Sequence, residues 1–152
     1  MSNYLELNKS QIKKIQRNSE PYLFLDYATK IIPGQIAEGY LDLNEKLWFF
    51  EVHWPEDPNM PGMLQVEALV QLSALTILTK PGNEGLLIYL LNAEKLVFKK
   101  KVTPNNRLVM KTKLLSYKRG IGICSGKSYI KDELVCSANF KILFPGDFPK
   151  IS

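Results

Sequence analysis

Histidine and cysteine are scarce in this chain of 152 residues, which contains one histidine and two cysteines. Zinc sites in proteins usually take three or four ligands from these residue types, so a His-rich zinc site and a structural Cys₄ or Cys₂His₂ site are excluded. Two cysteines also cannot build a disulfide framework. Any imidazole chemistry must therefore be carried out by His53, and we expect no metal.

Long hydrophobic runs are also missing. The longest apolar run extends from Leu86 to Leu91, whereas a membrane-spanning helix needs about 20 such residues. The first residues, MSNYLELNKSQIKK, lack the apolar core of a signal peptide. Together with the low cysteine content, these absences predict a cytoplasmic protein without a membrane span.

The composition is that of an ordinary globular protein, with 45% hydrophobic and 23% charged residues. No low-complexity tract, internal repeat or Gly/Ser linker divides the chain. A chain of this length usually forms one domain whose core folds without disulfides or metals. We therefore expect residues 1–152 to form a single domain.

Hydrophobic periodicity predicts one long helix among several strands. The long helix, residues 61–80, has Pro61-Gly62 at its start and Pro81-Gly82 after its end, which are typical boundary signals. A short amphipathic helix is predicted over residues 10–17. Extended segments are predicted over residues 22–25, 36–43, 47–52, 86–91, 95–102, 108–117, 120–130 and 134–144. This order indicates an α+β fold with an antiparallel sheet.

On a helical wheel, the long helix has two opposite faces. One stripe, which we interpret as the more exposed side, contains Gln65, Ser73, Thr76 and Lys80. Glu67 and Gln71 lie nearly opposite, among apolar residues, where a carboxylate is costly unless it is paired or protonated. Two interpretations of Glu67 remain open. It is either a structural carboxylate satisfied by Gln71 and backbone amides, or a general acid whose pKa is raised by desolvation.

A lone histidine such as His53 is more often a surface or core side chain than a catalyst. However, aromatic residues and prolines surround it, and a helix amino terminus follows at Gly62. That terminus presents unpaired backbone N–H groups and the positive end of the helix dipole. A base, a buried acid and an amide donor on one segment suit a reaction that builds negative charge on an oxygen while a proton moves nearby.

The segment from His53 to Gln71, HWPEDPNMPGMLQVEALVQ, resembles the signature of the (3R)-hydroxyacyl-[acyl carrier protein] dehydratases. That family has His-Phe-Pro, Pro, Met-Pro-Gly, Glu-Ala and Gln at the same spacings. Residues 21–26, PYLFLD, are similar to its proline-and-aromatic strand entry ending in Asp. Residues 89–100, YLLNAEKLVFKK, are similar to its Tyr…Asp-Lys…Phe-Arg/Lys-Arg/Lys segment. The resemblance thus covers nearly the whole chain.

The resemblance implies a hot-dog fold, an antiparallel β-sheet wrapped around one long central α-helix, in agreement with the α+β prediction. It also implies a homodimer or a trimer of dimers, with active sites at the dimer interface. The implied activity is dehydration of (3R)-3-hydroxyacyl-[acyl carrier protein] to trans-2-enoyl-[acyl carrier protein] in fatty acid or related lipid biosynthesis. No metal or organic cofactor is implied.

The resemblance also assigns roles at matching positions. His53 and Glu67 match the catalytic histidine and carboxyl, which opposite subunits contribute. Gly62 matches the amide that binds the thioester carbonyl, Gln71 the glutamine that holds the carboxyl, and Tyr89 an aromatic residue at the mouth of the acyl tunnel. Glutamate at position 67 favours simple dehydratase activity, because the sister dehydratase-isomerases have aspartate there.

The chain also departs from the family pattern. Val52 replaces a glycine and Trp54 a phenylalanine beside the histidine, while Lys101 and Asn105-Asn106 replace a proline and a Gly-Asp turn farther away. These differences suggest a divergent, specialised member. A hot-dog thioesterase and a catalytically silent relative that binds acyl groups or carrier protein remain alternatives. The Pro-Gly-(x)₄-Glu-Ala spacing after the histidine favours the dehydratase.

Charge is distributed unevenly. Residues 95–131 contain eleven of the 20 basic residues and no acidic one, while all 15 acidic residues lie elsewhere. A solvated strand face is one explanation, and an acidic macromolecular partner is the other. Nucleic acid is not favoured, because no aromatic stacking platform accompanies the basic residues. The resemblance implies acyl carrier protein, which is strongly acidic, and we expect it to dock at Lys99 and Lys100.

Overall fold

The structure, a computed structural model, describes residues 3–145. Its helices are α1 (Lys9–Ile15), α2 (Trp48–Val52) and α3 (Gly62–Leu78). Its strands are β1 (Leu5–Asn8), β2 (Tyr27–Ile32), β3 (Ile36–Asp42), β4 (Tyr89–Phe98), β5 (Arg107–Lys118), β6 (Ile121–Ile130) and β7 (Glu133–Leu143).

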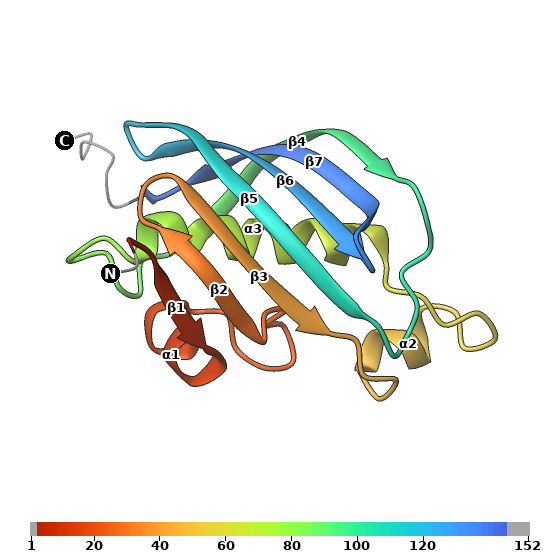
Figure 1. Cartoon of the computed structure of the whole chain (residues 1–152). Helices are drawn as coiled ribbons and strands as arrows, with labels where there is room; N and C mark the ends of the chain where they lie inside the picture. The colour runs from red at the N-terminus through yellow and green to blue at the C-terminus, as the bar shows by residue number, and fades with distance from the viewer. Residues whose placement is uncertain (1–2, 146–152) are drawn as a thin grey trace.

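The strands form one antiparallel sheet that curves around α3 (Figure 1). The strand order across the sheet is β1-β2-β3-β5-β6-β7-β4, so β1 and β4 are the two edges. Helices α1 and α2 lie toward opposite ends of α3. The predicted α+β layout, the long helix, and the strands at residues 36–43, 108–117, 120–130 and 134–144 are confirmed to within a few residues.

The predictions for residues 22–25, 47–52, 86–91 and 95–102 were wrong in whole or in part. Residues 22–25 belong to no strand, since β2 begins at Tyr27. Residues 47–52 form helix α2, in which the N–H of His53 donates to the carbonyl of Phe49 at 3.0 Å. A short apolar run fits a strand and a helix equally well, so periodicity could not separate them. The predicted strands 86–91 and 95–102 form one strand, β4, which continues through a bulge where Lys95 has a positive φ of 52°.

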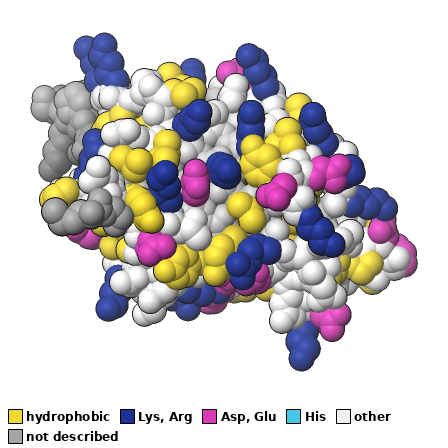
Figure 2. Space-filling model, viewed as in Figure 1, with side chains coloured by type: hydrophobic (Ala, Val, Ile, Leu, Met, Phe, Trp, Pro, Cys, Tyr) yellow, Lys and Arg dark blue, Asp and Glu magenta, His cyan; other side chains and the backbone are white. Residues whose placement is uncertain are grey.

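The outer side of the sheet carries several of the predicted basic residues. In the register of the sheet, Lys111 of β5 lies opposite Lys127 of β6 and Glu38 of β3. Lys and Arg side chains are spread over this side of the molecule, with acidic side chains between them (Figure 2). Because these lysines are exposed, part of the basic segment is a solvated sheet face.

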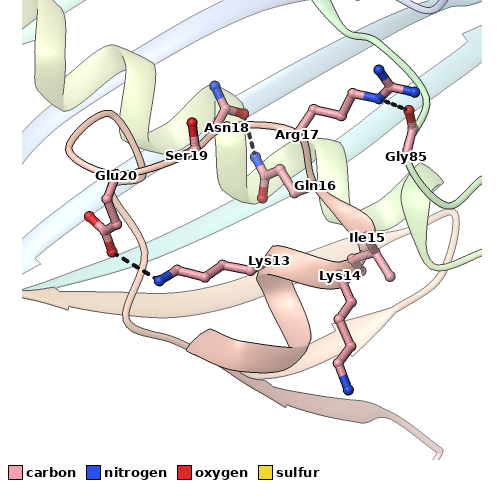
Figure 3. A pocket seen from close by; sticks show the side chains of 9 residues that line it. All are labelled: Lys13, Lys14, Ile15, Gln16, Arg17, Asn18, Ser19, Glu20 and Gly85. Carbon is pink, nitrogen blue, oxygen red and sulfur yellow. Dashed lines mark hydrogen bonds and ion pairs between the residues drawn. The ribbon is translucent and has the colours of Figure 1, made fainter.

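The chain between α1 and β2 packs along α3. Asn8 caps α1, since its side chain accepts a hydrogen bond from the N–H of Gln11 at 2.9 Å and its own N–H donates to the Gln11 side chain. After the helix, Arg17 Nε donates to the carbonyl of Gly85 at 2.6 Å (Figure 3). The apolar residues 23–25 that follow are buried, so this segment is fixed against the rest of the protein.

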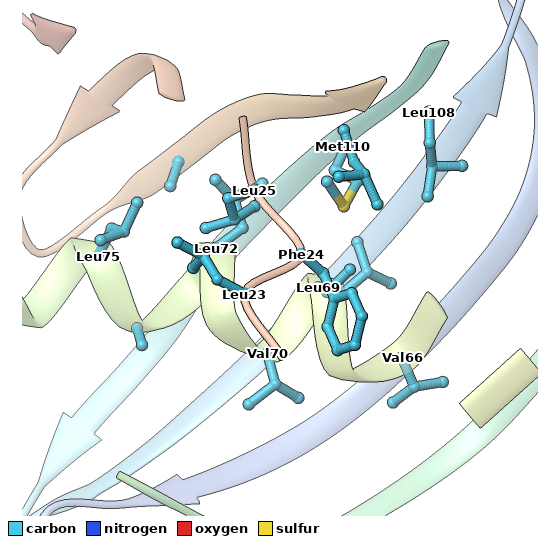
Figure 4. Packing of buried hydrophobic residues seen from close by; sticks show 14 of the residues in the cluster. Leu23, Phe24, Leu25, Val66, Leu69, Val70, Leu72, Leu75, Leu108 and Met110 are labelled. Carbon is cyan, nitrogen blue, oxygen red and sulfur yellow. The ribbon is translucent and has the colours of Figure 1, made fainter. Parts of the chain in front are cut away.

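The core lies between α3 and the inner side of the sheet (Figure 4). Two glycines allow the helix to approach the strands closely. A Cβ at Gly126 of β6 would lie 3.1 Å from Leu69, and a Cβ at Gly39 of β3 would lie 3.2 Å from Leu72. This close packing holds α3, and with it the candidate site residues, in a fixed position.

The predicted exposed face of α3 is buried instead. Gln65 is 3% exposed, and Ser73 and Thr76 are fully buried. These polar groups bond to nearby carbonyls: Gln65 Nε2 donates to Met60 at 3.0 Å, and Ser73 Oγ donates to Val70 at 2.8 Å. The opposite face, predicted to lie away from water, leaves Met63 59% exposed in the single chain.

Candidate active site

Glu67 lies in the second turn of α3 and is held by Gln71, one turn further on. Gln71 Nε2 donates to Glu67 Oε1 at 3.0 Å and to the carbonyl of Tyr22 at 2.9 Å. The side-chain oxygen of Gln71 accepts from the N–H of Phe24 at 2.9 Å. The backbone of residues 22–24 therefore fixes the Gln71 amide, which in turn orients the carboxyl of Glu67.

Burial raises the pKa of Glu67 above its ordinary value of 4.5, and the hydrogen bond from Gln71 lowers it by a smaller amount. Burial and the nearby Glu67 carboxylate also raise the pKa of Tyr22. Within residues 3–145, the N–H of Phe24 donates to the side chain of Gln71 and not to the carboxyl of Glu67. The carboxyl is thus only partly stabilised in its charged form, and it retains its proton more readily, as a general acid requires.

The raised pKa of Glu67 predicts a pH-dependent stability difference between the wild type and Glu67→Gln. A carboxyl with a higher pKa in the folded state contributes its full stability below the unfolded value of 4.5, and this contribution is lost as the pH rises through the folded pKa. Glutamine does not titrate. We therefore expect the free energy of unfolding of Glu67→Gln to rise relative to wild type as the pH increases from about 4.

Urea denaturation at several pH values measures this difference. Glu45→Gln, at an exposed position, is the control. A difference between Glu67→Gln and wild type that stays constant over the whole pH range would contradict the burial of this carboxyl.

His53 directly follows α2, and its ring lies beside that of Trp54, with ring centroids 5.6 Å apart. Its Nδ1 is 3.1 Å from the carbonyl oxygen of Asn59. Because a carbonyl oxygen only accepts, the hydrogen is assigned to Nδ1, and Nε2 of the neutral ring is left as an acceptor. This is the form that a general base requires. Both neighbouring departures from the family pattern, Val52 and Trp54, are exposed.

Gly62 occupies the first turn of α3, where backbone N–H groups have no acceptor within the helix. The ring of Phe98 covers this position closely, since a Cβ on Gly62 would lie 2.9 Å from it. Only glycine therefore allows the ring to lie there. A surface groove of about 540 Å³ runs beside Gly62 and is also lined by Phe98 and residues 99–101.

The predicted docking lysines lie where β4 ends, at this groove. Lys100 forms an ion pair with Glu133, and the neighbouring Lys101 forms one with Asp57 at 2.6 Å. Within the described residues, the Lys99 side chain makes no ion pair. Tyr89 is exposed and lies at the opposite end of β4. The groove thus connects the Gly62 amide with exposed positive charge.

One chain does not bring all the candidate residues together. Glu67 and Gln71 border a small cavity with Ile88 and Leu90. In residues 3–145, no hydrogen bond or ion pair joins His53 to Glu67. The base and the acid therefore make no direct polar contact with each other in the described part of a single copy.

Strand β4 is an open edge of the sheet with an apolar surface. Five of its large hydrophobic side chains are 41 to 52% exposed, namely Tyr89, Leu90, Leu91, Val97 and Phe98. A long apolar edge with unpaired backbone groups is a template for another strand. Sequence reasoning missed this edge because it divided β4 in two. The available signal was an apolar run without alternation, which is typical of strands covered on both faces.

No helix within residues 3–145 has the length and apolar character to cross a membrane. In the same range, no three His, Cys, Asp or Glu side chains are grouped so that they could hold a metal ion. Cys124 and Cys136 are free thiols, and burial raises the pKa of each to about 11. Such thiols are unreactive, so they carry no part of the candidate chemistry.

A sheet wrapped around a central helix, with a half-buried carboxyl on that helix and a histidine just before it, defines a hot-dog protein with a candidate acid–base site. The FabA-like domain model matches residues 18–139, and the chain belongs to this family. The 3-hydroxyacyl-[acyl-carrier-protein] dehydratase FabZ of Syntrophomonas wolfei is 35% identical over 136 residues, covering 90% of this chain and 94% of that protein. FabZ of Bacillus subtilis is 35% identical over 130 residues, with 86% and 92% covered.

Solved structures show the same fold at much lower sequence identity. The dehydratase heterocomplex ApeI:P from Xenorhabdus doucetiae matches with a TM-score of 0.76 and 13% identity over 88% of this chain and 90% of that chain. A hypothetical thioesterase protein with coenzyme A from Streptococcus pneumoniae matches with a TM-score of 0.61 and 15% identity, covering 80% and 87%. The predicted hot-dog fold is confirmed.

Proposed function

We propose that this chain dehydrates (3R)-3-hydroxyacyl-[acyl carrier protein] to trans-2-enoyl-[acyl carrier protein] in fatty acid biosynthesis. The observation that carries the proposal is the carboxyl of Glu67, which is held by Gln71 on the central helix and has a raised pKa. The FabZ relatives of 35% identity support the substrate class. Their names describe the dehydration of a 3-hydroxyacyl group carried by acyl carrier protein.

The active site is completed by a second copy of the chain. Pairing of two β4 edges would cover the apolar side chains that the single chain leaves exposed. It would also cover Met63 and the face of α3 that carries Glu67, so that His53 of one protomer meets Glu67 of its partner. The homodimer is the smallest assembly that meets this need, and a trimer of dimers contains the same pair.

The reaction then needs two proton transfers, one to His53 and one from Glu67. Nε2 of His53 takes a proton from C2, next to the thioester carbonyl. The N–H of Gly62 and the positive end of α3 stabilise the negative charge that grows on the carbonyl oxygen. Glu67 gives its proton to the C3 hydroxyl, which leaves as water while the C2–C3 double bond forms. Gln71 keeps the Glu67 carboxyl oriented throughout.

Acyl carrier protein docks at Lys99 and Lys100. Both lysines border the groove that contains the Gly62 amide, so a thioester carried by an acidic protein bound there would reach the candidate site. Lys99 has no carboxylate partner among the described residues and Lys100 pairs with Glu133, which leaves the local charge positive.

Charge reversal at this surface should separate docking from chemistry. Lys99→Glu with Lys100→Glu is expected to lower kcat/KM on the protein-bound substrate by about 10-fold or more at low salt, because electrostatic steering is lost. Activity on a small thioester mimic should not change. The deficit should shrink at high salt, since screening already acts over about 8 Å at physiological ionic strength.

A matched control for this pair is Lys111→Glu with Lys127→Glu, two exposed lysines on the outer side of the sheet. This control should retain activity on both substrates. Equal losses on the carrier protein and on the mimic in the Lys99 and Lys100 variant would place the damage in the pocket and contradict the docking assignment.

Hydration of an enoyl thioester such as crotonyl-pantetheine, the reverse reaction, tests the activity itself. A dehydratase consumes the conjugated double bond and leaves the thioester intact. A thioesterase releases free thiol instead, and a silent binding module does neither. We expect loss of the double bond without release of thiol.

A further inference from the structure

The loop between His53 and α3, residues 54–61, contains the carbonyl that accepts the hydrogen of the His53 ring. Inside this loop, the N–H of Asp57 donates to the carbonyl of Trp54 at 3.0 Å, and Asn59 Nδ2 donates to the carbonyl of Asp57 at 2.8 Å. The carbonyl oxygen of Asn59 is the acceptor that lies 3.1 Å from His53 Nδ1. The position of the loop therefore decides which ring nitrogen of His53 is left as the base.

Two contacts fix the 54–61 loop against the segment that follows β4. Lys101 Nζ donates to Asp57 Oδ2 at 2.6 Å, and the two side chains form an ion pair. Two side chains of this pair are well exposed, at 65% and 52%. Further along the loop, the N–H of Met60 donates to the carbonyl of Val102 at 2.8 Å, and both of these residues are buried. Asn59 lies between the two contacts, so the ion pair holds one side of it and the core holds the other.

We propose that the ion pair of Lys101 with Asp57 positions His53 as the base, an inference that rests on the proposed dehydratase activity. The ion pair holds the turn at Asp57, and the carbonyl of this turn accepts from the Asn59 side chain. The backbone carbonyl of Asn59 in turn keeps the ring hydrogen of His53 on Nδ1, which leaves Nε2 to accept the C2 proton. Lys101 and Asp57 act through the loop, so both are positioning residues.

This ion pair gives a physical meaning to one departure of the chain from the family pattern. Lys101 replaces a proline, and a proline has no charge that could pair with Asp57. An exposed ion pair contributes little to the stability of a fold. Its loss should therefore change how firmly the loop holds the His53 ring, while the buried contact of Met60 with Val102 keeps the loop folded.

The test uses the fact that the chain contains one histidine, so the imidazole signals of protein labelled with ¹⁵N at histidine come from His53 alone. Nitrogen NMR, recorded where the ring is neutral, distinguishes the nitrogen that carries the hydrogen from the one that does not. We expect the hydrogen on Nδ1 in the wild type and in Lys101→Arg, which keeps the charge. Lys101→Met and Asp57→Asn should each show a mixture of the two neutral forms.

Kinetics on a small thioester mimic, which needs no docking, provide the second readout. Lys101→Met and Asp57→Asn should each lower kcat by about 2- to 5-fold, the range expected for one exposed ion pair, and leave KM unchanged. The double variant should be no slower than either single one, because both substitutions remove the same contact. Glu133→Gln is the matched control, since it removes the ion pair of the neighbouring Lys100 outside the 54–61 loop. It should change neither the spectrum nor kcat on the mimic.

Wild-type imidazole spectra in Lys101→Met and Asp57→Asn would overturn the proposal, as would a wild type with its ring hydrogen on Nε2. Altered spectra with an unchanged kcat would also overturn it, because the ring would then need no positioning by this pair. A wild type without dehydratase activity would overturn the proposed function instead. In that case the spectra would still decide whether the ion pair fixes the His53 ring.

Discussion

His53→Ala and Glu67→Gln are each expected to lower the rate of dehydration by about 10²- to 10⁴-fold, the usual contribution of a positioned general acid or base. Alanine removes the ring nitrogen that takes the C2 proton. Glutamine keeps the size of Glu67 and its contact with Gln71, but it has no proton of suitable acidity for the leaving hydroxyl. Steady-state kinetics should show the loss mainly in kcat, because both groups act in the transition state.

These variants should keep the fold and the oligomeric state of the wild type. His53 is only partly buried, and among residues 3–145 its side chain makes one hydrogen bond, to the backbone of Asn59. Glu45→Gln, an exposed substitution of the same chemistry as Glu67→Gln, serves as the control and should retain full activity. Turnover close to that of wild type in either His53→Ala or Glu67→Gln would refute the assignment of base and acid.

Leu91→Asp is expected to separate the dimer and abolish most of the activity. Leu91 is 48% exposed on β4, and a carboxylate there would be buried without a partner when two edges pair. A separated protomer holds His53 without the Glu67 of its partner. We therefore expect monomers in analytical ultracentrifugation and a loss of activity of about 10²-fold or more, since the monomer lacks one of the two acid–base groups.

Leu115→Asp is the matched control, because Leu115 is 60% exposed on β5, an interior strand that has neighbours on both sides. This variant should remain dimeric and active. Monomers that keep full activity after Leu91→Asp would contradict the shared site, and unchanged dimers would contradict the β4 interface.

The elements with clear boundary residues, or with alternating apolar and polar residues, were predictable from the sequence. Pro61-Gly62 and Pro81-Gly82 bound the long helix, and the buried face of β7 alternates from Cys136 to Ile142 as predicted. Helix α2 was not predictable in this way. It has only five residues, too few to show a helical period. The packing of Phe49 and Phe50 into the core decides between helix and strand.

The error on α3 has a tertiary cause. A helical wheel assumes that the polar stripe faces water, but the sheet covers that side of the helix, so Gln65 and Ser73 bond to carbonyls inside the protein. The face with Met63 and Glu67 is left for a second copy of the chain. The pattern of residues along one helix cannot show that a second copy of the chain covers this face.

The candidate site was predictable where the residues lie in one motif, from His53 to Gln71. The backbone groups that hold Gln71 were missed, because the carbonyl of Tyr22 and the N–H of Phe24 lie 49 and 47 residues away from it in the sequence. Only the folded chain places them beside Gln71.

The central claim is that each active site takes His53 from one protomer and Glu67 from its partner. Producing His53→Ala and Glu67→Gln together in equal amounts tests it most directly. If pairing is random, about half of the dimers contain one chain of each kind, and each such dimer has one intact site and one doubly altered site. The account predicts recovery of about a quarter of the wild-type activity from two chains that are inactive alone. Activity that stays at the level of the single variants, in a mixture shown to contain mixed dimers, would contradict it.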